Sequence, residues 1–95
     1  MCYINYMEIE FDPNKNEWNI HERGLSFDMT RELDWDNAIY SPDDRKGYGE
    51  TRVRALLKDA EGKPYIVAYT QKGNVRRIIS FRRAHEKERK RYEKT

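Results

Sequence analysis

The sequence predicts one α+β domain with two N-terminal helices, a mainly antiparallel sheet of three to four strands, and a C-terminal helix. Its 95 residues suffice for a single modest core. Residues 51–81 contain three stretches that alternate apolar and polar side chains, separated by short turns that carry glycine. Residues that commonly start and stop helices flank the segments on either side of these strands.

The first predicted element is a half-buried strand at residues 7–11, where apolar and acidic side chains alternate. Residues 1–6 either lengthen this strand or form an N-terminal extension of the domain. Asp12-Pro13 is typical of a helix N-cap followed by proline at the first helical position, and Gly24 is typical of a helix end. On the helix between them, we expect Trp18 to anchor the core.

Ser26 is a second N-cap candidate and predicts another short helix after the Gly24-Leu25 corner. Residues 38–40 predict a brief edge strand. Residues 41–49 contain several turn-forming side chains and predict a mobile loop.

The three alternating stretches, residues 51–58, 64–70 and 75–81, predict an antiparallel meander. Strict alternation in the third strand places Phe81 on the face of Arg77 and Ile79, opposite Ile78 and Ser80. Both faces of the last two strands are partly apolar, so helices should cover one face and part of the other. From Ala84 onward no glycine or proline interrupts a run of helix formers, and this final helix should present one stripe: Phe81, Ala84, His85, Glu88 and Tyr92.

Charge is distributed unevenly along the chain. Through Asp44 there are eleven acidic and three basic residues, a net charge of −8; from Arg45 onward there are sixteen basic and six acidic residues, a net charge of +10. A basic half of this kind is typical of phosphate contact, because lysine and arginine release counterions from nucleic acid. A surface charged only for solubility would give the same composition.

Several classes of protein are disfavoured by composition. The single cysteine, Cys2, cannot form an internal disulfide. No apolar run of about 18 residues predicts a membrane span, and no signal peptide is recognisable, so we expect a cytoplasmic protein that does not contact membranes. Two histidines with one cysteine are too few for a closed zinc site, and we expect neither a metal nor a cofactor.

A succession of short motifs runs along residues 7–92. The motifs are Phe11-Asp12-Pro13 with Lys15 and Asn19, Arg23-Gly24-Leu25-Ser26-Phe27, Gly49-Glu50-Thr51-Arg52, Tyr69-Thr70, and Arg77-Ile78-Ile79-Ser80-Phe81-Arg82-Arg83-Ala84 with Glu88-Arg89 and Tyr92. In this order and spacing the motifs resemble the BrnT toxin family. The chain departs from the family pattern at two places. Glu22-Arg23-Gly24 stands where many members carry Lys-His-Gly, and Phe81 stands where alanine is usual.

The resemblance implies a RelE-like fold and a ribonuclease toxin of a type II toxin–antitoxin system that shuts down translation. It also implies a BrnA-like antitoxin with a ribbon-helix-helix domain, commonly in a two-plus-two heterotetramer. In such a system RNA is the substrate, and operator DNA is bound only through the antitoxin.

RNA cleavage without a metal requires activation of a ribose 2′-hydroxyl, stabilisation of the charged transition state, and protonation of the leaving oxygen. Arginine suits the second task because its planar donors grip two phosphate oxygens at once. The catalytic candidates are Arg77, Arg82 and Arg83 for the phosphate, and His85, Tyr92 and Glu50 for proton transfer. The candidates for RNA binding are Lys15, Arg52, Arg76 and Arg89.

Each candidate also has a structural interpretation. The arginines could form surface ion pairs, His85 could cap or pack against the last helix, Tyr92 could be a core ring, and Glu50 could orient Arg52. The competing hypothesis is a noncatalytic module that uses the same basic face to bind nucleic acid or an acidic partner.

Overall fold

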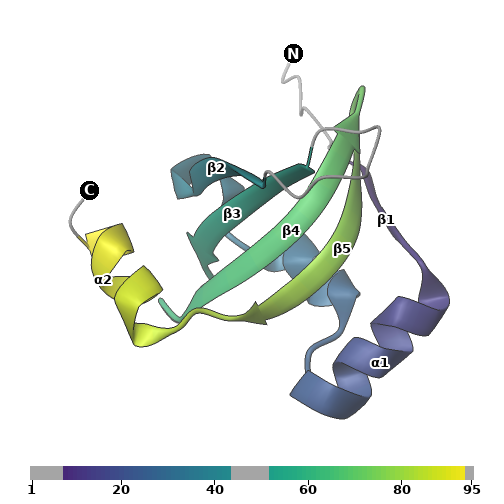
Figure 1. Ribbon diagram of the computed structural model, residues 1–95, viewed down its shortest axis with the longest axis horizontal. Helices are drawn as coiled ribbons and strands as arrows, with labels where there is room; N and C mark the ends of the chain where they lie inside the picture. The colour runs from purple at the N-terminus through teal and green to yellow at the C-terminus, as the bar shows by residue number, and fades with distance from the viewer. Residues whose placement is uncertain (1–7, 44–51, 94–95) are drawn as a thin grey trace.

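A five-stranded mixed sheet, in the order β1-β5-β4-β3-β2, forms the centre of the computed structural model (Figure 1). The structure describes residues 8–43 and 52–93, so the predictions for residues 1–7, for the loop at residues 44–49 and for Glu50 lie outside the described part. The elements in chain order are β1 (Glu8–Phe11), α1 (Pro13–Arg23), the 3₁₀ helices η1 (Phe27–Glu32) and η2 (Trp35–Asn37), β2 (Ile39–Asp43), β3 (Arg52–Lys58), β4 (Pro64–Lys72), β5 (Val75–Arg83) and α2 (Glu86–Glu93).

The predicted meander is confirmed, since β3, β4 and β5 pair antiparallel in sequence order. The sheet is larger than predicted because strands join both of its edges. β2 pairs antiparallel with β3, and β1 pairs parallel with β5. The prediction of a loop from residue 41 onward was wrong for Ser41, Pro42 and Asp43, which continue β2. Proline is compatible with that position because an edge strand leaves one side of its backbone outside the ladder.

β5 contains one extra residue, and this β-bulge corrects the predicted faces of the strand. Ser80 is opposite Ala68 and Ile78 is opposite Tyr69, which leaves Ile79 as the additional residue. An inserted residue reverses the alternation beyond it. Phe81 therefore joins Ile78 in the core instead of sharing a face with Arg77.

The core lies between one face of the sheet and the segment that contains η1 and η2. Ring contacts join the two layers, with centroid separations of 5.6 Å for Phe11 and Phe27 and 5.5 Å for Trp35 and Tyr69. The buried members of this core are Leu25, Phe27, Leu33, Ala55, Leu57, Tyr65, Val67, Tyr69, Ile78 and Phe81.

The first predicted helix is confirmed with both of its ends. Asp12 Oδ1 accepts a hydrogen bond from the backbone N–H of Asn14 at 2.9 Å, and Pro13 is the first helical residue. Gly24 closes α1 in the left-handed region at φ 68°, where a residue with a Cβ would be strained.

The second predicted helix has Ser26 as its N-cap, as expected, but it is a 3₁₀ helix rather than an α-helix. Local side-chain bonds favour the tighter turn: Ser26 Oγ accepts from the backbone N–H of Asp28, and Thr30 Oγ1 donates to the carbonyl of Phe27.

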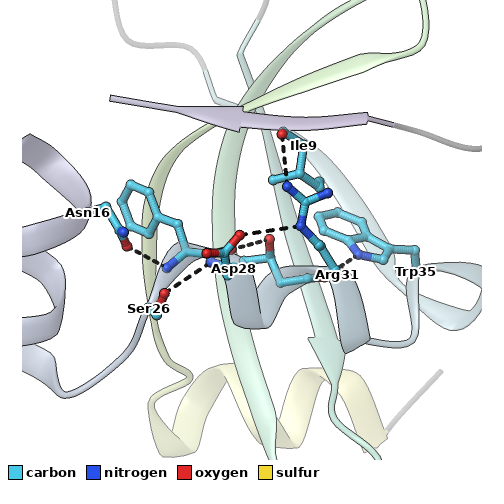
Figure 2. Close-up of polar contacts among 8 residues, drawn as sticks. Ile9, Asn16, Ser26, Asp28, Arg31 and Trp35 are labelled. Carbon is cyan, nitrogen blue, oxygen red and sulfur yellow. Dashed lines mark hydrogen bonds and ion pairs between the residues drawn. The ribbon is translucent and has the colours of Figure 1, made fainter. Parts of the chain in front are cut away.

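Polar contacts fix η1 between α1 and β1, as Figure 2 shows. Asn16 Oδ1 on α1 accepts from the backbone N–H of Phe27 at 2.8 Å. Arg31 donates to the carbonyl of Ile9 on β1 and forms an ion pair with Asp28. Trp35 Nε1 donates to the carbonyl of Thr30 at 2.7 Å. η1 is thereby bonded to α1 near its start and to β1 near its end.

The C-terminal helix begins two residues later than predicted, at Glu86. His85 precedes it and is exposed, so the prediction that His85 lies on the stripe of this helix was wrong. The cause is a cap, because Glu88 Oε1 accepts from the backbone N–H of His85 at 2.8 Å. α1 lies beside β5 and contacts it, whereas α2 follows the end of β5 and contacts β3 (Figure 1). No helix in the described ranges is long and apolar enough to cross a membrane.

Candidate functional site

α1 docks against the part of β5 that β1 leaves uncovered. β1 pairs only with Val75–Ile78, so the carbonyl of Phe81 lies beyond it. Asn19 Nδ2 donates to that carbonyl and to the carbonyl of Leu25, both at 2.9 Å. Asn19 is 1% exposed while Trp18 is 54% exposed, so the prediction of Trp18 as the core anchor was wrong. The polar side chain faces β5 because the edge of the sheet presents carbonyls there.

This junction contains a cavity of about 300 Å³, which we name the α1 pocket. It brings together two RNA-binding candidates from distant parts of the chain, Lys15 on α1 and Arg52 on β3. It adds the cation of Arg23, the hydroxyl of Ser80 and the ring of Trp18, which were not predicted as site residues. The lining residues are Lys15, Trp18, Asn19, Arg23, Phe27, Arg52, Ile79 and Ser80, and none of these eight carries a carboxylate.

Arg23 is held in the α1 pocket by several contacts of one nitrogen. Its Nη1 donates to Asn19 Oδ1 at 3.2 Å, Ser80 Oγ at 3.3 Å and the carbonyl of Phe81 at 3.4 Å. Its guanidinium carbon lies 5.1 Å from the centroid of the Trp18 ring, within the range of a cation–π contact. The guanidinium therefore has a defined orientation although the side chain reaches solvent.

Arg52 and Arg77 lie on the face of the sheet opposite the core, as predicted for neighbours across the sheet. Thr70 separates them, because it is opposite Arg52 on one side and Arg77 on the other. Arg52 is only 6% exposed. Arg77 is half-exposed and its Nη1 lies 3.1 Å from Glu10 Oε1. Arg52 lines the α1 pocket. Arg77 forms an ion pair with Glu10 and does not line this pocket.

A second cavity of about 390 Å³, the α2 pocket, lies where β5 meets α2. It brings together the predicted residues Arg83 and Arg89 and adds Lys63 from the β3–β4 turn. Glu86 also lines it, so its positive charge is less concentrated than that of the α1 pocket. Burial raises the pKa of the neighbouring Tyr65 hydroxyl, and the negative charge of Asp59 adds to this effect.

Two predicted arginines are engaged elsewhere in the protein. Arg82 forms a two-pronged ion pair with Glu88, at 2.9 and 3.0 Å, and joins α2 to β5. The hydrogen bond from Arg82 lowers the pKa of Glu88 to about 2, in spite of partial burial. Arg76 lies on the other face of the strand, with its guanidinium carbon 4.0 Å from the Trp35 ring centroid. Neither side chain lines the α1 pocket.

The predicted proton carriers are not gathered at the α1 pocket within the described part of the chain. His85 is exposed and lines neither of the two pockets. Tyr92 lies on α2, but its side chain is outside the description, as is the whole of Glu50. Their roles stay predictions from sequence.

Sequence reasoning missed Trp18, Arg23, Ser80 and Lys63 as site residues. One signal was available, since Lys15, Asn19 and Arg23 recur at intervals of four and therefore share a face of α1. Arg23 was also the site of a departure from the family pattern. No comparable local signal marks Ser80, whose orientation depends on the bulge at Ile79.

Comparison with known proteins gives two findings. A family model described as the ribonuclease toxin BrnT of type II toxin–antitoxin systems matches residues 11–88. The fold is similar to that of the Brucella abortus ribonuclease toxin BrnT, with a TM-score of 0.64 and 24% sequence identity, covering 84% of this chain and 99% of that one. No curated protein matches the chain in sequence. Because the family match spans residues 11–88, well over half of the 95-residue chain, the chain belongs to the BrnT family of type II toxin–antitoxin ribonuclease toxins.

Proposed function

We propose that this protein is a metal-independent endoribonuclease whose phosphate site is the α1 pocket. The observation that carries the proposal is the convergence of Lys15, Arg23 and Arg52 in a cavity whose lining has no carboxylate. Such a cluster attracts a phosphodiester by charge and can donate several hydrogen bonds to its oxygens. Family membership supports RNA as the substrate.

The chemistry we propose is an in-line attack of a ribose 2′-oxygen on the adjacent phosphorus. The new P–O2′ bond forms as the P–O5′ bond breaks; a base removes the 2′ proton and an acid protonates the departing 5′-oxygen. Arg23 is already oriented by Asn19, so its donors stabilise the charge on the phosphorus oxygens without reorganisation. Arg52 is buried, where reduced solvent screening strengthens its attraction for the same charge.

The proton carriers come from the residues predicted by sequence. His85, Tyr92 and Glu50 are the candidates for the base and the acid. Arg83 and Arg89, in the α2 pocket, would bind the RNA backbone away from the reacting phosphate.

A type II toxin–antitoxin system pairs its toxin with a protein antitoxin. We propose that the antitoxin is BrnA-like and assembles with the toxin as a two-plus-two heterotetramer. Its ribbon-helix-helix domain would bind operator DNA, and free toxin would arrest translation in the cytoplasm by cleaving RNA. Coexpression with the product of an adjacent ribbon-helix-helix gene should restore the growth of cells that express this chain.

RNA cleavage in EDTA tests the enzymatic proposal. The wild-type protein should cleave, and Lys15→Ala or Arg23→Ala should lower the rate by about 100-fold or more if each stabilises the transition state. Lys72→Ala is the matched control, because Lys72 is an exposed cation at the end of β4 that lines neither pocket. Circular dichroism would confirm that each variant is folded. Cleavage at the wild-type rate by both pocket variants would refute the assignment of this site.

The same assay distinguishes the ribonuclease from the competing hypothesis, a noncatalytic binding module. That hypothesis predicts RNA binding that weakens with salt, no cleavage products, and normal growth of cells that express the chain. Cleavage by the wild-type protein together with growth arrest would exclude it.

A further inference from the structure

We infer that Trp18 stacks on an unpaired base of the bound RNA, which makes single-stranded RNA the substrate class. The inference rests on the proposed function, because it assigns a nucleotide to the same pocket. It adds a second recognition element to the pocket: a ring that binds the base beside cations that bind the phosphate.

The exposure of Trp18 is the first observation. The residue is 54% exposed on α1, although a tryptophan ring is among the largest apolar surfaces a protein can bury. The other tryptophan, Trp35, is partly buried, packs against Tyr69 and donates its N–H to the carbonyl of Thr30. Trp18 is therefore left at the surface while Asn19 beside it is buried. An exposed ring at the rim of a cationic cavity is suited to contact a ligand.

The orientation of the ring is the second observation. Arg23 lies over the Trp18 ring and is itself fixed by Asn19 and Ser80. Lys15 lies one helical turn before Trp18 and lines the same cavity. A nucleotide joins a flat aromatic base to an anionic phosphate, and this pocket places a flat ring next to three cations. The two halves of the site thus match the two halves of one nucleotide.

The geometry favours unpaired over paired RNA. A base inside a duplex is stacked on both faces by its neighbours, so its flat surface is not available to a protein ring. Aromatic stacking is the usual way in which proteins bind bases of single strands, and it tolerates any base because each has a π-face. Trp18 should consequently contribute affinity for single strands with little sequence preference.

The test measures binding separately from cleavage. The probes are short oligodeoxynucleotides, which lack the 2′-hydroxyl and cannot be cleaved, as single strands and as the matching duplex. Single strands should quench the intrinsic tryptophan fluorescence, and Trp18→Phe should abolish most of this change while retaining binding. Trp18→Ala should weaken binding by about 5- to 150-fold, the usual range for loss of one stacked base. Ile20→Ala is the matched control, because Ile20 is 44% exposed on the same helix but does not line the pocket.

The outcomes distinguish this inference from the proposed function. If the Trp18→Ala variant binds single strands and cleaves RNA as the wild type does, the inference is overturned and the ribonuclease proposal stands. Stronger Trp18-dependent binding of the duplex than of the single strand would also overturn it. Quenching by single strands without any RNA cleavage by the wild-type protein would instead support the Trp18 contact and refute the enzymatic proposal. Loss of antitoxin binding alone, with RNA binding unchanged, would reassign Trp18 to the protein partner.

Discussion

Replacing Asn19 with alanine should lower the free energy of unfolding by about 2–4 kcal/mol. The side chain is 1% exposed, and its Nδ2 satisfies the carbonyls of Leu25 and Phe81. A buried polar group that loses its partner costs about 1–3 kcal/mol. The loss at Phe81 is partly offset, since Arg23 Nη1 lies 3.4 Å from the same carbonyl. We therefore expect less than the sum of two full penalties.

The assay for this prediction is urea denaturation, with thermal unfolding as a second measure. A loss of 2 kcal/mol corresponds to a fall in Tm of at least about 8 °C for a domain of this size. Asn19→Asp should be no better than Asn19→Ala, because a carboxylate in place of the amide cannot donate to either carbonyl. Asn14→Ala is the control, an exposed position on the same helix that should change stability by less than about 0.5 kcal/mol. Wild-type stability of Asn19→Asp at neutral pH would refute the proposed docking of α1.

The remaining predictions concern the C-terminal ion pair and the first helix cap. Arg82 lowers the pKa of Glu88 to about 2 in the folded protein. At a pH above the pKa of this carboxyl group in the unfolded chain, the ionised carboxylate should therefore stabilise the fold by about 3 kcal/mol or less. This stabilisation should be lost as the pH falls through the pKa of Glu88 in the folded protein. The free energy of unfolding of the wild type should therefore fall more steeply between about pH 5 and 2 than that of Glu88→Gln. Identical pH profiles for the two proteins would contradict the prediction. Asp12→Ala should cost about 1 kcal/mol in urea denaturation through loss of the N-cap bond, and an unchanged midpoint would show that the cap is unimportant.

Local sequence patterns predicted the regular elements well. Asp12-Pro13 and Gly24 marked the ends of α1, and the alternating stretches marked β3, β4 and β5. These patterns succeed because caps and period-two alternation depend on a few adjacent residues. The bulge at Ile79 has no such pattern, so alternation placed Phe81 on the wrong face of β5.

The site was predicted less completely, because it joins residues that are distant in sequence. Lys15 and Arg52 were both candidates, but nothing local indicated that they share one cavity with Ser80. Arg82 and Arg83 are neighbours in sequence and were given the same role. The structure separates them, since Arg82 binds Glu88 whereas Arg83 lines the α2 pocket.

The sequence by itself determined the fold class, the family resemblance, and the concentration of positive charge in the second half of the chain. Only the tertiary structure decided which cations converge. The edge of β5 presents the carbonyl of Phe81, and this carbonyl draws Asn19 inward and leaves Trp18 at the surface beside Arg23. The physical reason is that a buried carbonyl requires a donor, and which side chain supplies it depends on how α1 meets the sheet.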